Sequence, residues 1–516
     1  MNSLKSWNLK TNLISGFTVF LIALPLSIGI SVASGAPPTA GLLSAIIGGI
    51  VASLISGSHV TISGPAAGLI VVVLECINSL GQGDAMRGFR LTLAAIVIAG
   101  VLQIFMGLMR WGTLGLAVPI NALHGMMASI GITIITKQMY VLGGIKPAAK
   151  NLIGQIIELP SRLLDDNMVI LAIGVLCLLI VIGVNYLPRV KKVAPPALFA
   201  VMIGYALSLF IDIEHSHFIN IFNHEYHVGP EFLLSIPQEI SGYFHQPLFQ
   251  DLTSTHFFKA VITIALVASI ESLLSTYAVD KLDPLKRTSN LNKDLISKGA
   301  SNILLGFIGG LPIISEIVRS TANISSGATN RVSNFAHGVF ILVFILLFPQ
   351  FLSHIPLSAF AAILIFVGFR LANPLQILNV YKSGKSQVLI FLVTIATTLS
   401  TDLLIGIFTG AALELAINFI KVKDFPQLFK INTKIAQATD QVILHVDGSC
   451  VFTNMLSLKG TIEAQTAKVI IVQFLPNQFV DTTSKDLLQT LQQKFLNEKR
   501  ILLFKNVDIS SQNSGH

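Results

Sequence analysis

The sequence has 516 residues, of which 53% are hydrophobic and only 12% are charged, and its mean hydropathy is +0.74. An ordinary soluble domain carries about twice that charged fraction, so the composition excludes a water-soluble globular protein for most of the chain. The formal net charge of +8 lies almost entirely in short loops between apolar runs, which indicates cytosolic loops of a membrane protein rather than a nucleic-acid-binding surface.

Apolar runs long enough to cross a bilayer, about 20 residues or somewhat fewer, follow one another along the chain. We read the first run as a retained span rather than a signal peptide, because it is long enough to cross and has no convincing cleavage site. The first half has seven runs, at 12–33, 39–56, 64–80, 89–109, 113–135, 168–184 and 194–211. An amphipathic stretch at 138–163 is expected to lie along the membrane interface.

A polar loop at 212–256 separates the two halves of the chain. The second half has seven more runs, at 257–278, 293–310, 312–326, 332–352, 357–371, 387–402 and 404–421. An odd number of spans in each half gives the halves opposite orientations, as in inverted-repeat transporters. The sequence therefore predicts an all-α polytopic membrane protein of about fourteen spans, arranged as 7+7 inverted repeats over residues 12–211 and 257–421.

The positions of lysine and arginine predict the orientation of the spans. Cytosolic loops of membrane proteins are rich in these residues, and the 212–256 loop contains neither. With a cytosolic N-terminus, the cytosolic loops hold Arg189, Lys191, Lys192, Lys281, Lys286, Arg287, Lys293, Lys298, Lys382 and Lys385. Four residues do not fit this orientation, because Lys137, Lys146, Lys150 and Arg162 would then be external. We expect a multi-pass protein of the cell membrane with both the N-terminus and the C-terminal domain in the cytosol.

The third span of each half is short and begins with glycine and proline. The first reads Ser63-Gly64-Pro65-Ala66-Ala67-Gly68, and the second reads Gly309-Gly310-Leu311-Pro312-Ile313-Ile314-Ser315. Proline is tolerated in the first helical turn, and we expect each helix to begin there, inside the membrane. Free backbone N–H groups of two facing helix starts would then form an anion site. The alternative is that these are ordinary helix kinks.

Arg319 follows Pro312 by seven residues, which places it about two turns into the second short helix. A cation inside the membrane is costly unless it faces protein, water or substrate. We favour an anchor for the anion, and the alternative is a structural pair with Glu316 on the same helix face. The predicted substrate-binding residues are Gly64, Pro65, Ala66, Ala67, Pro312, Ile313, Ser315, Glu316 and Arg319.

Glu271 and Ser275 lie one turn apart on the eighth span and offer oxygen ligands near the middle of the membrane. Such a pair suits a coupling cation such as sodium. Two alternatives remain open, in which Glu271 carries a proton or only accepts a hydrogen bond. For other polar residues in or near spans, the structural interpretation is preferred; these are Glu75, Asn121, His124, Asn334, His337, Asp402 and Glu414.

The composition becomes that of a soluble domain after Lys421. Short strands are predicted at 441–446, 468–474 and 501–504, with an amphipathic helix at 484–495. This alternation predicts a small α/β domain. Residues 482–484 are either phosphorylation sites or a helix cap, and we prefer the cap. The predicted domains are therefore a transmembrane domain at 1–425 and a cytosolic domain at 437–508.

Taken together, these stretches resemble the SulP sulfate-permease family of anion transporters. The resemblance rests on the two Gly-Pro helix starts, on the eighth-span stretch continuing to Asp280, Asn290 and Gly299, and on Arg319-Ser320-Thr321-Ala322-Asn323. The first span, Ala23 to Gly35 followed by Pro37, is similar to members associated with bicarbonate uptake, with Leu26 where other members have glutamate. The C-terminal segment is similar, over a shorter stretch, to the STAS domain that closes many family members.

The resemblance implies a core domain of spans one to four and eight to eleven that moves against a gate domain, with the anion between spans three and ten. It also implies that Glu271 and Ser275 match the sodium-binding positions of coupled members, in which the acid is commonly aspartate. The glutamate therefore leaves proton coupling open. Glu316 replaces the small residue of many members and argues against divalent sulfate unless Arg319 or a proton neutralises it.

The predicted function is secondary active transport of an inorganic anion, with bicarbonate placed ahead of sulfate, by symport with sodium or protons. The alternatives are an uncoupled exchanger or channel, and a membrane sensor that no longer transports. Nucleobase carriers share the implied fold, but Arg319 favours a charged substrate. An enzyme is not expected, because no nucleophile, metal cluster or phosphate loop appears. The expected partners are the anion, the lipid bilayer and a second copy of the chain in a homodimer, without nucleic acid; sodium is the one bound ion considered, and no other cofactor is expected.

Overall fold

The computed structural model describes residues 9–113, 118–149, 151–163, 167–191, 194–221, 224–237, 239–285, 287–438, 441–476 and 478–507. Lys150, Lys192 and Lys286, which entered the orientation prediction, lie outside these residues. Contacts divide the chain into two compact units. One consists of Met1–Gly112 and Ile130–Leu371, and the other of Thr113–Ser129 and Ala372–His516.

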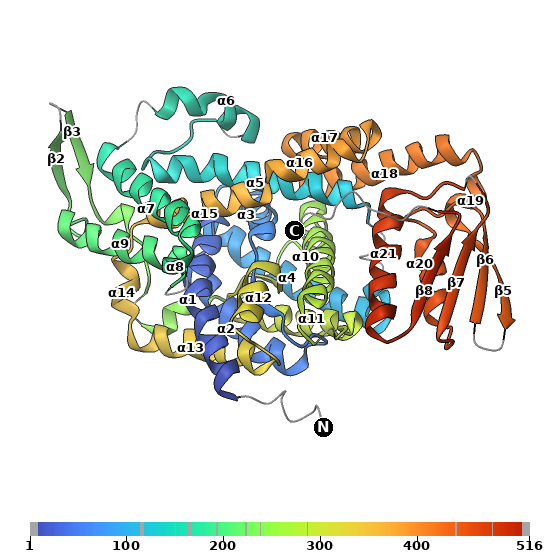
Figure 1. Ribbon diagram of the computed structural model, residues 1–516. Helices are drawn as coiled ribbons and strands as arrows, with labels where there is room; N and C mark the ends of the chain where they lie inside the picture. The colour runs from blue at the N-terminus through green and yellow to red at the C-terminus, as the bar shows by residue number, and fades with distance from the viewer. Residues whose placement is uncertain are drawn as a thin grey trace. The chain divides into compact units, whose positions relative to one another are not determined.

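The membrane part of the chain is helical, as Figure 1 shows. The helices of the first half are α1 (Leu9–Ala33), α2 (Pro38–Ile55), α3 (Ile70–Gly81), α4 (Ala85–Leu108), α5 (Ile120–Leu142), α6 (Leu152–Arg162), α7 (Met168–Tyr186), α8 (Pro188–Lys191) and α9 (Pro196–Ile211). Those of the second half are α10 (Thr255–Leu282), α11 (Leu291–Ile308), α12 (Ile317–Ser325), α13 (Val332–Leu347), α14 (Pro349–Ser353), α15 (Leu357–Leu371), α16 (Pro374–Lys382), α17 (Lys385–Ser400) and α18 (Leu403–Val422).

Each predicted span coincides with a helix in the described part of the chain. Seven of these helices are at least 18 residues long and apolar enough to cross a membrane, and five more are shorter apolar helices. The remaining two, α11 and α12, meet neither description, since α11 carries three charged residues and α12 has nine residues. The fifth span differs most, because 113–135 was predicted and α5 covers Ile120–Leu142. The amphipathic stretch predicted at 138–163 divides into the end of α5 and the separate helix α6, which exposes Ile153, Ile156 and Ile157.

Several helices begin where the sequence supplies a capping side chain. Asp84 accepts hydrogen bonds from the backbone N–H groups of Met86 and Arg87 at the start of α4. Asn167, Ser254, Asn290 and Asp402 cap α7, α10, α11 and α18 in the same way. These side chains satisfy backbone donors that have no partner within the helix, so the local sequence determines where these spans start.

Helices of the two halves pack together in matching pairs within the first unit. Helix α4 packs along α11, and α13 packs along α2. In the same way α4 contacts α10 while α13 contacts α1, and α3 contacts α10 while α12 contacts α1. A large apolar core joins α1 to α7, α9, α13 and α15. Each of these three contacts between the first four spans and spans eight to eleven therefore has a counterpart with the roles of the two halves exchanged.

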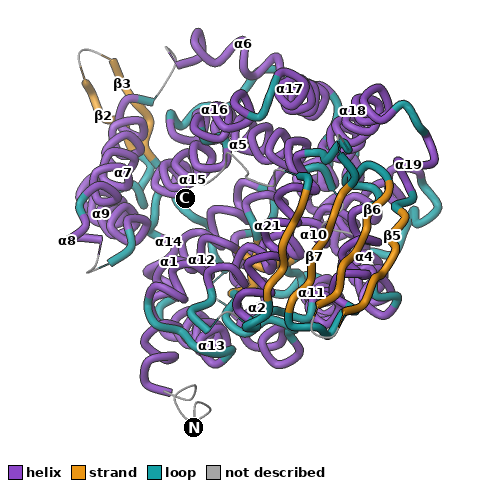
Figure 2. Tube along the Cα trace, turned by 45° about the vertical axis from the view of Figure 1, so that its right-hand side comes forward, coloured by secondary structure: helices purple, strands orange, loops and turns teal. Residues whose placement is uncertain are grey.

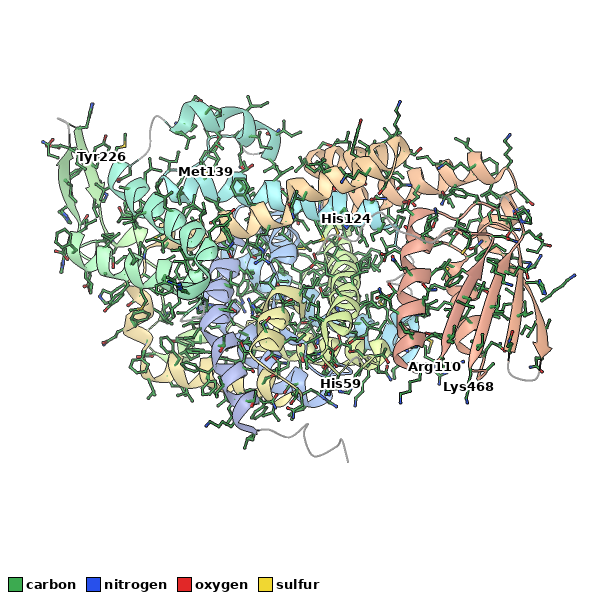
Figure 3. All side chains as sticks on the ribbon, viewed as in Figure 1. His59, Arg110, His124, Met139, Tyr226 and Lys468 are labelled. Atoms are coloured by element: carbon green, nitrogen blue, oxygen red, sulfur yellow. The ribbon has the colours of Figure 1, made fainter. Side chains whose placement is uncertain are left out.

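The polar loop at 212–256 contains a two-stranded antiparallel hairpin, β2 (His217–Ile221) with β3 (His224–Val228), which the sequence interpretation did not predict. Tyr226 on β3 is labelled in Figure 3. Two 3-10 turns follow it, at Pro230–Phe232 and Ile240–Tyr243. The alternation of half-buried and exposed residues along β2 is typical of a hairpin with one covered face.

A four-stranded mixed sheet lies at the C-terminal end of the chain, and Figure 2 shows its strands side by side. The elements are α19 (Phe425–Phe429), β5 (Asn432–Ala438), β6 (Gln441–Asp447), α20 (Met455–Glu463), β7 (Val469–Phe474), α21 (Thr482–Asn497) and β8 (Ile501–Lys505). The strand order is β5-β6-β7-β8, antiparallel for the first pair and parallel for the others. Strands β6, β7 and β8 and helix α21 confirm the predicted elements, whereas β5 and α20 were not predicted.

The cap of α21 differs from the one expected. Asp481, rather than Thr482, Thr483 or Ser484, caps the helix by accepting a hydrogen bond from the Ser484 backbone N–H at 2.7 Å. The second oxygen of Asp481 accepts from Asn418 of α18 at 3.0 Å. A carboxylate at a helix start also interacts favourably with the helix dipole.

Candidate anion site

The starts of the two short helices meet in an antiparallel strand pair inside the first unit. Strand β1 (Ile62–Pro65) pairs with β4 (Ile313–Glu316), so that Ser63 lies opposite Ser315 and Gly64 opposite Ile314. The two segments are about 250 residues apart in the chain, and the sequence interpretation placed both at one anion site. Their meeting follows that expectation, whereas the binding of an anion there stays a prediction.

The prolines do not begin the helices, and this part of the prediction was wrong. Pro65 is the last residue of β1, and a 3-10 turn at Ala67–Leu69 leads into α3. Pro312 precedes β4, so α12 begins five residues later at Ile317. The backbone stays extended after each proline because it pairs with the other strand, a long-range contact that outweighs the local preference of proline for a first helical turn.

In the described part of the chain, neither helix start is capped by the side chain of the residue that precedes it, although the Glu316 carboxylate of β4 approaches the Ala67 N–H. Ala66 precedes the turn at Ala67, and Glu316 precedes α12; within the described residues, neither side chain makes a capping hydrogen bond. The first N–H groups of a helix have no partner inside the helix, and the helix dipole adds partial positive charge there. The two starts therefore offer donors for a small anion.

Arg319 lies in the first turn of α12 rather than two turns into it, because the helix starts later than predicted. Its side chain is fully buried, and Nη2 donates to the Pro65 carbonyl oxygen at 3.2 Å. Within the described residues, Nε and Nη1 have no hydrogen-bond partner. Arg319 therefore reaches from α12 to the end of β1 and keeps donors available, and it makes no hydrogen bond to Glu316.

Two carboxylates approach the start of α3. The Glu316 carboxylate lies close enough to the Ala67 backbone N–H to interact with it. Glu271 of α10 lies against Gly68, where an added Cβ atom would be 1.8 Å from Glu271 Oε1. Within the described residues, Glu271 Oε2 is buried without a hydrogen-bond partner. Glu271, the acid of the predicted cation pair, therefore lies beside the predicted anion site, and Ser275, one turn after it, is buried.

An ion pair on α11 was missed by the sequence interpretation. Lys298 was counted as a cytosolic loop residue, and this was wrong, because it lies within α11 and is fully buried beside Asp294. Lys298 Nζ is 3.1 Å from Asp294 Oδ1 and 2.8 Å from Ser63 Oγ. An acidic and a basic residue four positions apart in an otherwise apolar helix is the signal that could have identified the pair.

Two of the other polar residues assigned to structure make structural contacts, Asn334 at the site and Asp402 within the second unit. Asn334 donates to the Gly48 carbonyl oxygen at 3.0 Å and accepts from the Ser63 N–H at 3.4 Å. Asp402 caps α18 through the Ile405 N–H. In contrast, both ring nitrogens of His337 are buried without a partner in the described part of the protein.

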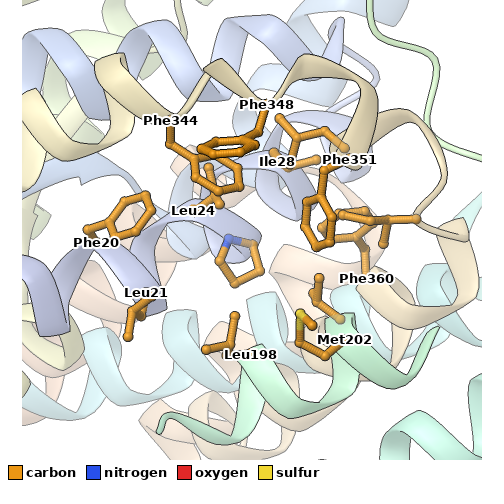
Figure 4. A pocket seen from close by; sticks show the side chains of 14 residues that line it. Phe20, Leu21, Leu24, Ile28, Leu198, Met202, Phe344, Phe348, Phe351 and Phe360 are labelled. Carbon is orange, nitrogen blue, oxygen red and sulfur yellow. The ribbon is translucent and has the colours of Figure 1, made fainter. Parts of the chain in front are cut away.

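A cavity of about 250 Å³ lies elsewhere in the first unit, and Figure 4 shows its walls. The lining side chains are all apolar and come from α1, α9 and the segment from α13 to α15; they include Phe20, Leu24, Met202, Phe344 and Phe360. An apolar cavity cannot replace the hydration shell of an anion. The crossing of β1 and β4 is therefore the better candidate for the anion site.

Comparison with protein-family models gives a match to the Sulfate permease family over residues 9–394. The chain is 26% identical over 507 residues to "Putative sulfate transporter YvdB" of Bacillus subtilis, which covers 95% of this chain and 90% of that protein. It is 27% identical over 452 residues to "Bicarbonate transporter BicA" of Synechocystis, covering 86% of this chain and 75% of that protein.

Two solved structures extend the comparison. The transmembrane domain of a cyanobacterial bicarbonate transporter, BicA, matches with a TM-score of 0.65 and 27% identity, covering 77% of this chain and 97% of that chain. The structure of SLC26A9 matches with a TM-score of 0.70 over 99% of this chain and 87% of that chain, and at 14% identity it shows likeness of fold alone. The family model covers most of the chain, which is therefore a multi-pass membrane anion transporter, rather than an enzyme, and belongs to the Sulfate permease family.

Proposed function

We propose that this chain is a secondary active transporter that carries a small inorganic anion by alternating access. The observation that supports this most is the crossing of β1 and β4, where two uncapped helix starts meet the free guanidinium nitrogens of Arg319. Such donors are strong ligands for a planar or tetrahedral oxyanion. In this proposal the anion lies between Gly64 to Ala67 and Pro312 to Arg319, and it takes the donors that the protein leaves unpaired.

The substrate in this proposal is bicarbonate ahead of sulfate. Relatives with bicarbonate in their names match the chain over most of its length. The Glu316 carboxylate, which interacts with the Ala67 N–H, adds negative charge at the anion site. Repulsion between like charges rises with the charge of the substrate, so a monovalent anion is favoured over a divalent one.

The proposed mode is symport, with a cation at Glu271 and Ser275. Glu271 Oε2 is a buried oxygen without a partner in the described residues, and a sodium ion or a proton would satisfy it. The carboxylate also lies against Gly68 at the start of α3. A cation there would offset the negative charge of the anion a short distance away, which explains why the two ions would travel together.

The proposed architecture has fourteen spans in two inverted repeats of seven, with spans one to four and eight to eleven as the core and the remaining spans as the gate. The matching contacts of α4 with α11 and of α13 with α2 support this arrangement. The proposed domains are 1–425 in the membrane and a STAS-like domain at 437–508 in the cytosol. We further propose that the N-terminus is cytosolic and that the protein is a homodimer in the cell membrane.

Uptake into proteoliposomes tests the proposed function. Labelled bicarbonate, sulfate and chloride are offered with no gradient, with an inward sodium gradient and with an inward proton gradient. Accumulation of bicarbonate above its external concentration under one gradient is the expected result. Exchange without accumulation would identify an uncoupled exchanger or channel instead. Absence of flux for every anion, from protein that still binds one, would identify a membrane sensor.

A further inference from the structure

The buried ion pair of Asp294 and Lys298 has no part in the function proposed above. Both side chains are 0% exposed and lie one turn apart on α11. Removing two charges from water is costly, and their attraction repays this only when other hydrogen bonds satisfy the remaining atoms. The hydrogen-bond partners of this fully buried ion pair should therefore indicate why it is present beside the candidate anion site.

The ion pair is hydrogen-bonded to both strands of the anion site, at residues that lie opposite each other. Lys298 Nζ donates to Ser63 Oγ of β1 at 2.8 Å, and Asp294 Oδ2 accepts from Ser315 Oγ of β4 at 3.1 Å. Ser63 and Ser315 lie opposite each other in the strand register. A two-stranded sheet of four residues per strand is not stable alone. The position of the crossing therefore depends on α11.

The same carboxylate is bonded to α10, the helix of the candidate cation site. Asp294 Oδ2 accepts from Thr276 Oγ1 at 3.0 Å and from Ser272 Oγ at 3.4 Å. Ser272 directly follows Glu271, and Thr276 directly follows Ser275. Ser272 Oγ also accepts from the Ser315 backbone N–H at 3.1 Å. A cation that draws in Glu271 and Ser275 would therefore move the groups that hold Asp294.

We propose that Asp294 and Lys298 are positioning residues that transmit occupancy of the cation site on α10 to the anion site at the crossing of β1 and β4. The inference rests on the proposed coupled transport. The two residues are fixed on one helix, so a displacement of Asp294 also displaces Lys298 and with it Ser63. Coupling of this kind is reciprocal: the factor by which the cation tightens anion binding equals the factor by which the anion tightens cation binding.

The test is the double variant Asp294→Leu/Lys298→Met, which replaces the pair with apolar side chains of similar size. Such replacements of buried ion pairs commonly leave a protein folded. Bicarbonate binding to the purified full-length protein is measured by calorimetry without a cation and with saturating sodium, and again at two proton concentrations. In the wild-type protein we expect the cation to tighten binding by about 5- to 150-fold, and in the variant by less than about twofold.

A matched control is Asp283→Leu/Arg287→Met. It removes another ion pair four residues apart, with 2.8 Å between Arg287 Nε and Asp283 Oδ2. Among the described residues, this pair makes no hydrogen bond to β1 or β4. We expect this control to keep the wild-type ratio of bicarbonate affinity with the cation to bicarbonate affinity without it. Should the first double variant not fold, Thr276→Val removes one link between α10 and Asp294 while keeping the ion pair, and the ratio is again expected to fall.

Coupled transport and the positioning role of Asp294 and Lys298 can be overturned separately. A coupled wild-type protein whose Asp294→Leu/Lys298→Met and Thr276→Val variants keep the full ratio would overturn the positioning role and leave the proposed transport intact. A wild-type ratio of one for both sodium and protons would overturn coupled transport and this inference together. Loss of the ratio in the control as well as in the variants would also overturn the inference, because the effect would then not be specific to α11.

Discussion

Gly64 lies so close to Arg319 that a Cβ atom added at this glycine would be 2.5 Å from Arg319 Nη1. Real Cβ atoms do not approach another heavy atom so closely, so any other residue at position 64 would displace the guanidinium. Glycine is therefore needed at position 64 because the buried guanidinium of Arg319 occupies the space where a side chain would lie. It is not explained by backbone conformation, because Gly64 is absent from the described residues with positive φ.

We predict that Gly64→Ala weakens anion binding by roughly tenfold, equivalent to about 1.4 kcal/mol, because it moves the donors of Arg319. The measurement is the dissociation constant of bicarbonate for the purified protein. Gly183→Ala in α7 is the control, since an added Cβ atom there meets no heavy atom within 4 Å. Equal affinities for the two variants and the wild type would show that the position of Arg319 does not matter for the anion.

The second prediction concerns Glu271. We expect Glu271→Gln to abolish gradient-driven accumulation while the yield of folded protein stays near wild type, because glutamine keeps the size and loses the charge that holds a cation. Uptake under an imposed sodium or proton gradient is the measurement. Ser269→Ala, on the same helix, serves as the control, because the Ser269 hydroxyl accepts a 3.3 Å bond from the uncharged Gln103 side chain. Unchanged cation dependence in Glu271→Gln would place the coupling site elsewhere.

The spans could be predicted because each requires a run of apolar residues that the lipid imposes locally. The pairing of β1 with β4 could not, because it joins segments about 250 residues apart, and it moved the start of α12 from Pro312 to Ile317. That shift also changed the position of Arg319 in its helix. The residue types of the site were recognisable from sequence, whereas their exact backbone setting depended on a long-range contact.

Lys298 and β5 were missed for different physical reasons. The spacing of Lys298 from Asp294 indicates the ion pair, but the contact with Ser63 of β1 joins residues 235 positions apart and cannot be read from neighbours in sequence. Strand β5 is an edge strand with mostly exposed, polar residues, and it lacks the apolar alternation that identifies a half-buried strand. Both cases depend on distant parts of the chain rather than on local preference.

The third prediction concerns orientation. Ser216 lies exposed in the loop expected outside the cell, and Ser457 lies exposed in the C-terminal domain expected in the cytosol. An impermeant thiol reagent should label Ser216→Cys in intact cells and Ser457→Cys only after permeabilisation. The native cysteines at 76, 177 and 450 are buried, so background labelling should be low. The opposite pattern would reverse the topology.

The fourth prediction is a pH dependence in the connection to α6. Glu158 accepts hydrogen bonds from the backbone N–H groups of Ala149 and Ala148, and the bond from Ala149 is the main reason that its pKa lies below the ordinary value of 4.5. Because its pKa is lowered in the folded protein, the ionised Glu158 carboxylate stabilises this connection fully above pH 4.5. The stabilisation is lost as the pH falls below 4.5 and passes through the folded-state pKa. Protection of the Ala148 and Ala149 amides from hydrogen exchange should follow that loss.

The control for this pH effect lies in the same segment. Asn151 caps α6 by accepting from the Gly154 N–H at 2.9 Å, and its side chain does not titrate. Protection of the Gly154 amide should therefore not change over the same pH range. In Glu158→Gln, the amide oxygen can still accept these bonds but does not titrate, so protection of Ala148 and Ala149 should not change with pH. Protection that still falls on acidification in this variant would assign the effect to another group.

The last prediction concerns Arg319, which we expect to bind the anion together with the uncapped helix starts. A charge-assisted hydrogen bond contributes roughly 1.5 to 3 kcal/mol, so Arg319→Gln should weaken anion binding on the order of tenfold to a hundredfold. Arg319→Lys should recover only part of this, because lysine keeps the charge but not the planar donor fork that matches an oxyanion. Arg331→Gln is the control, since Arg331 Nη1 donates to the Ser56 carbonyl oxygen at 3.1 Å.

The alternative is that Arg319 only neutralises Glu316, and a double variant separates the two roles. If neutralisation were the sole role, Glu316→Gln/Arg319→Gln would remove both the repulsion between Glu316 and the anion and the Arg319 charge that compensates for it. Anion binding would then return to the wild-type level. If Arg319 contacts the anion, the double variant should stay weak, because no donor replaces the guanidinium. The free Nε and Nη1 atoms of Arg319 favour the second outcome. Wild-type affinity in the double variant, measured by the same binding experiment, would therefore exclude Arg319 as an anion ligand.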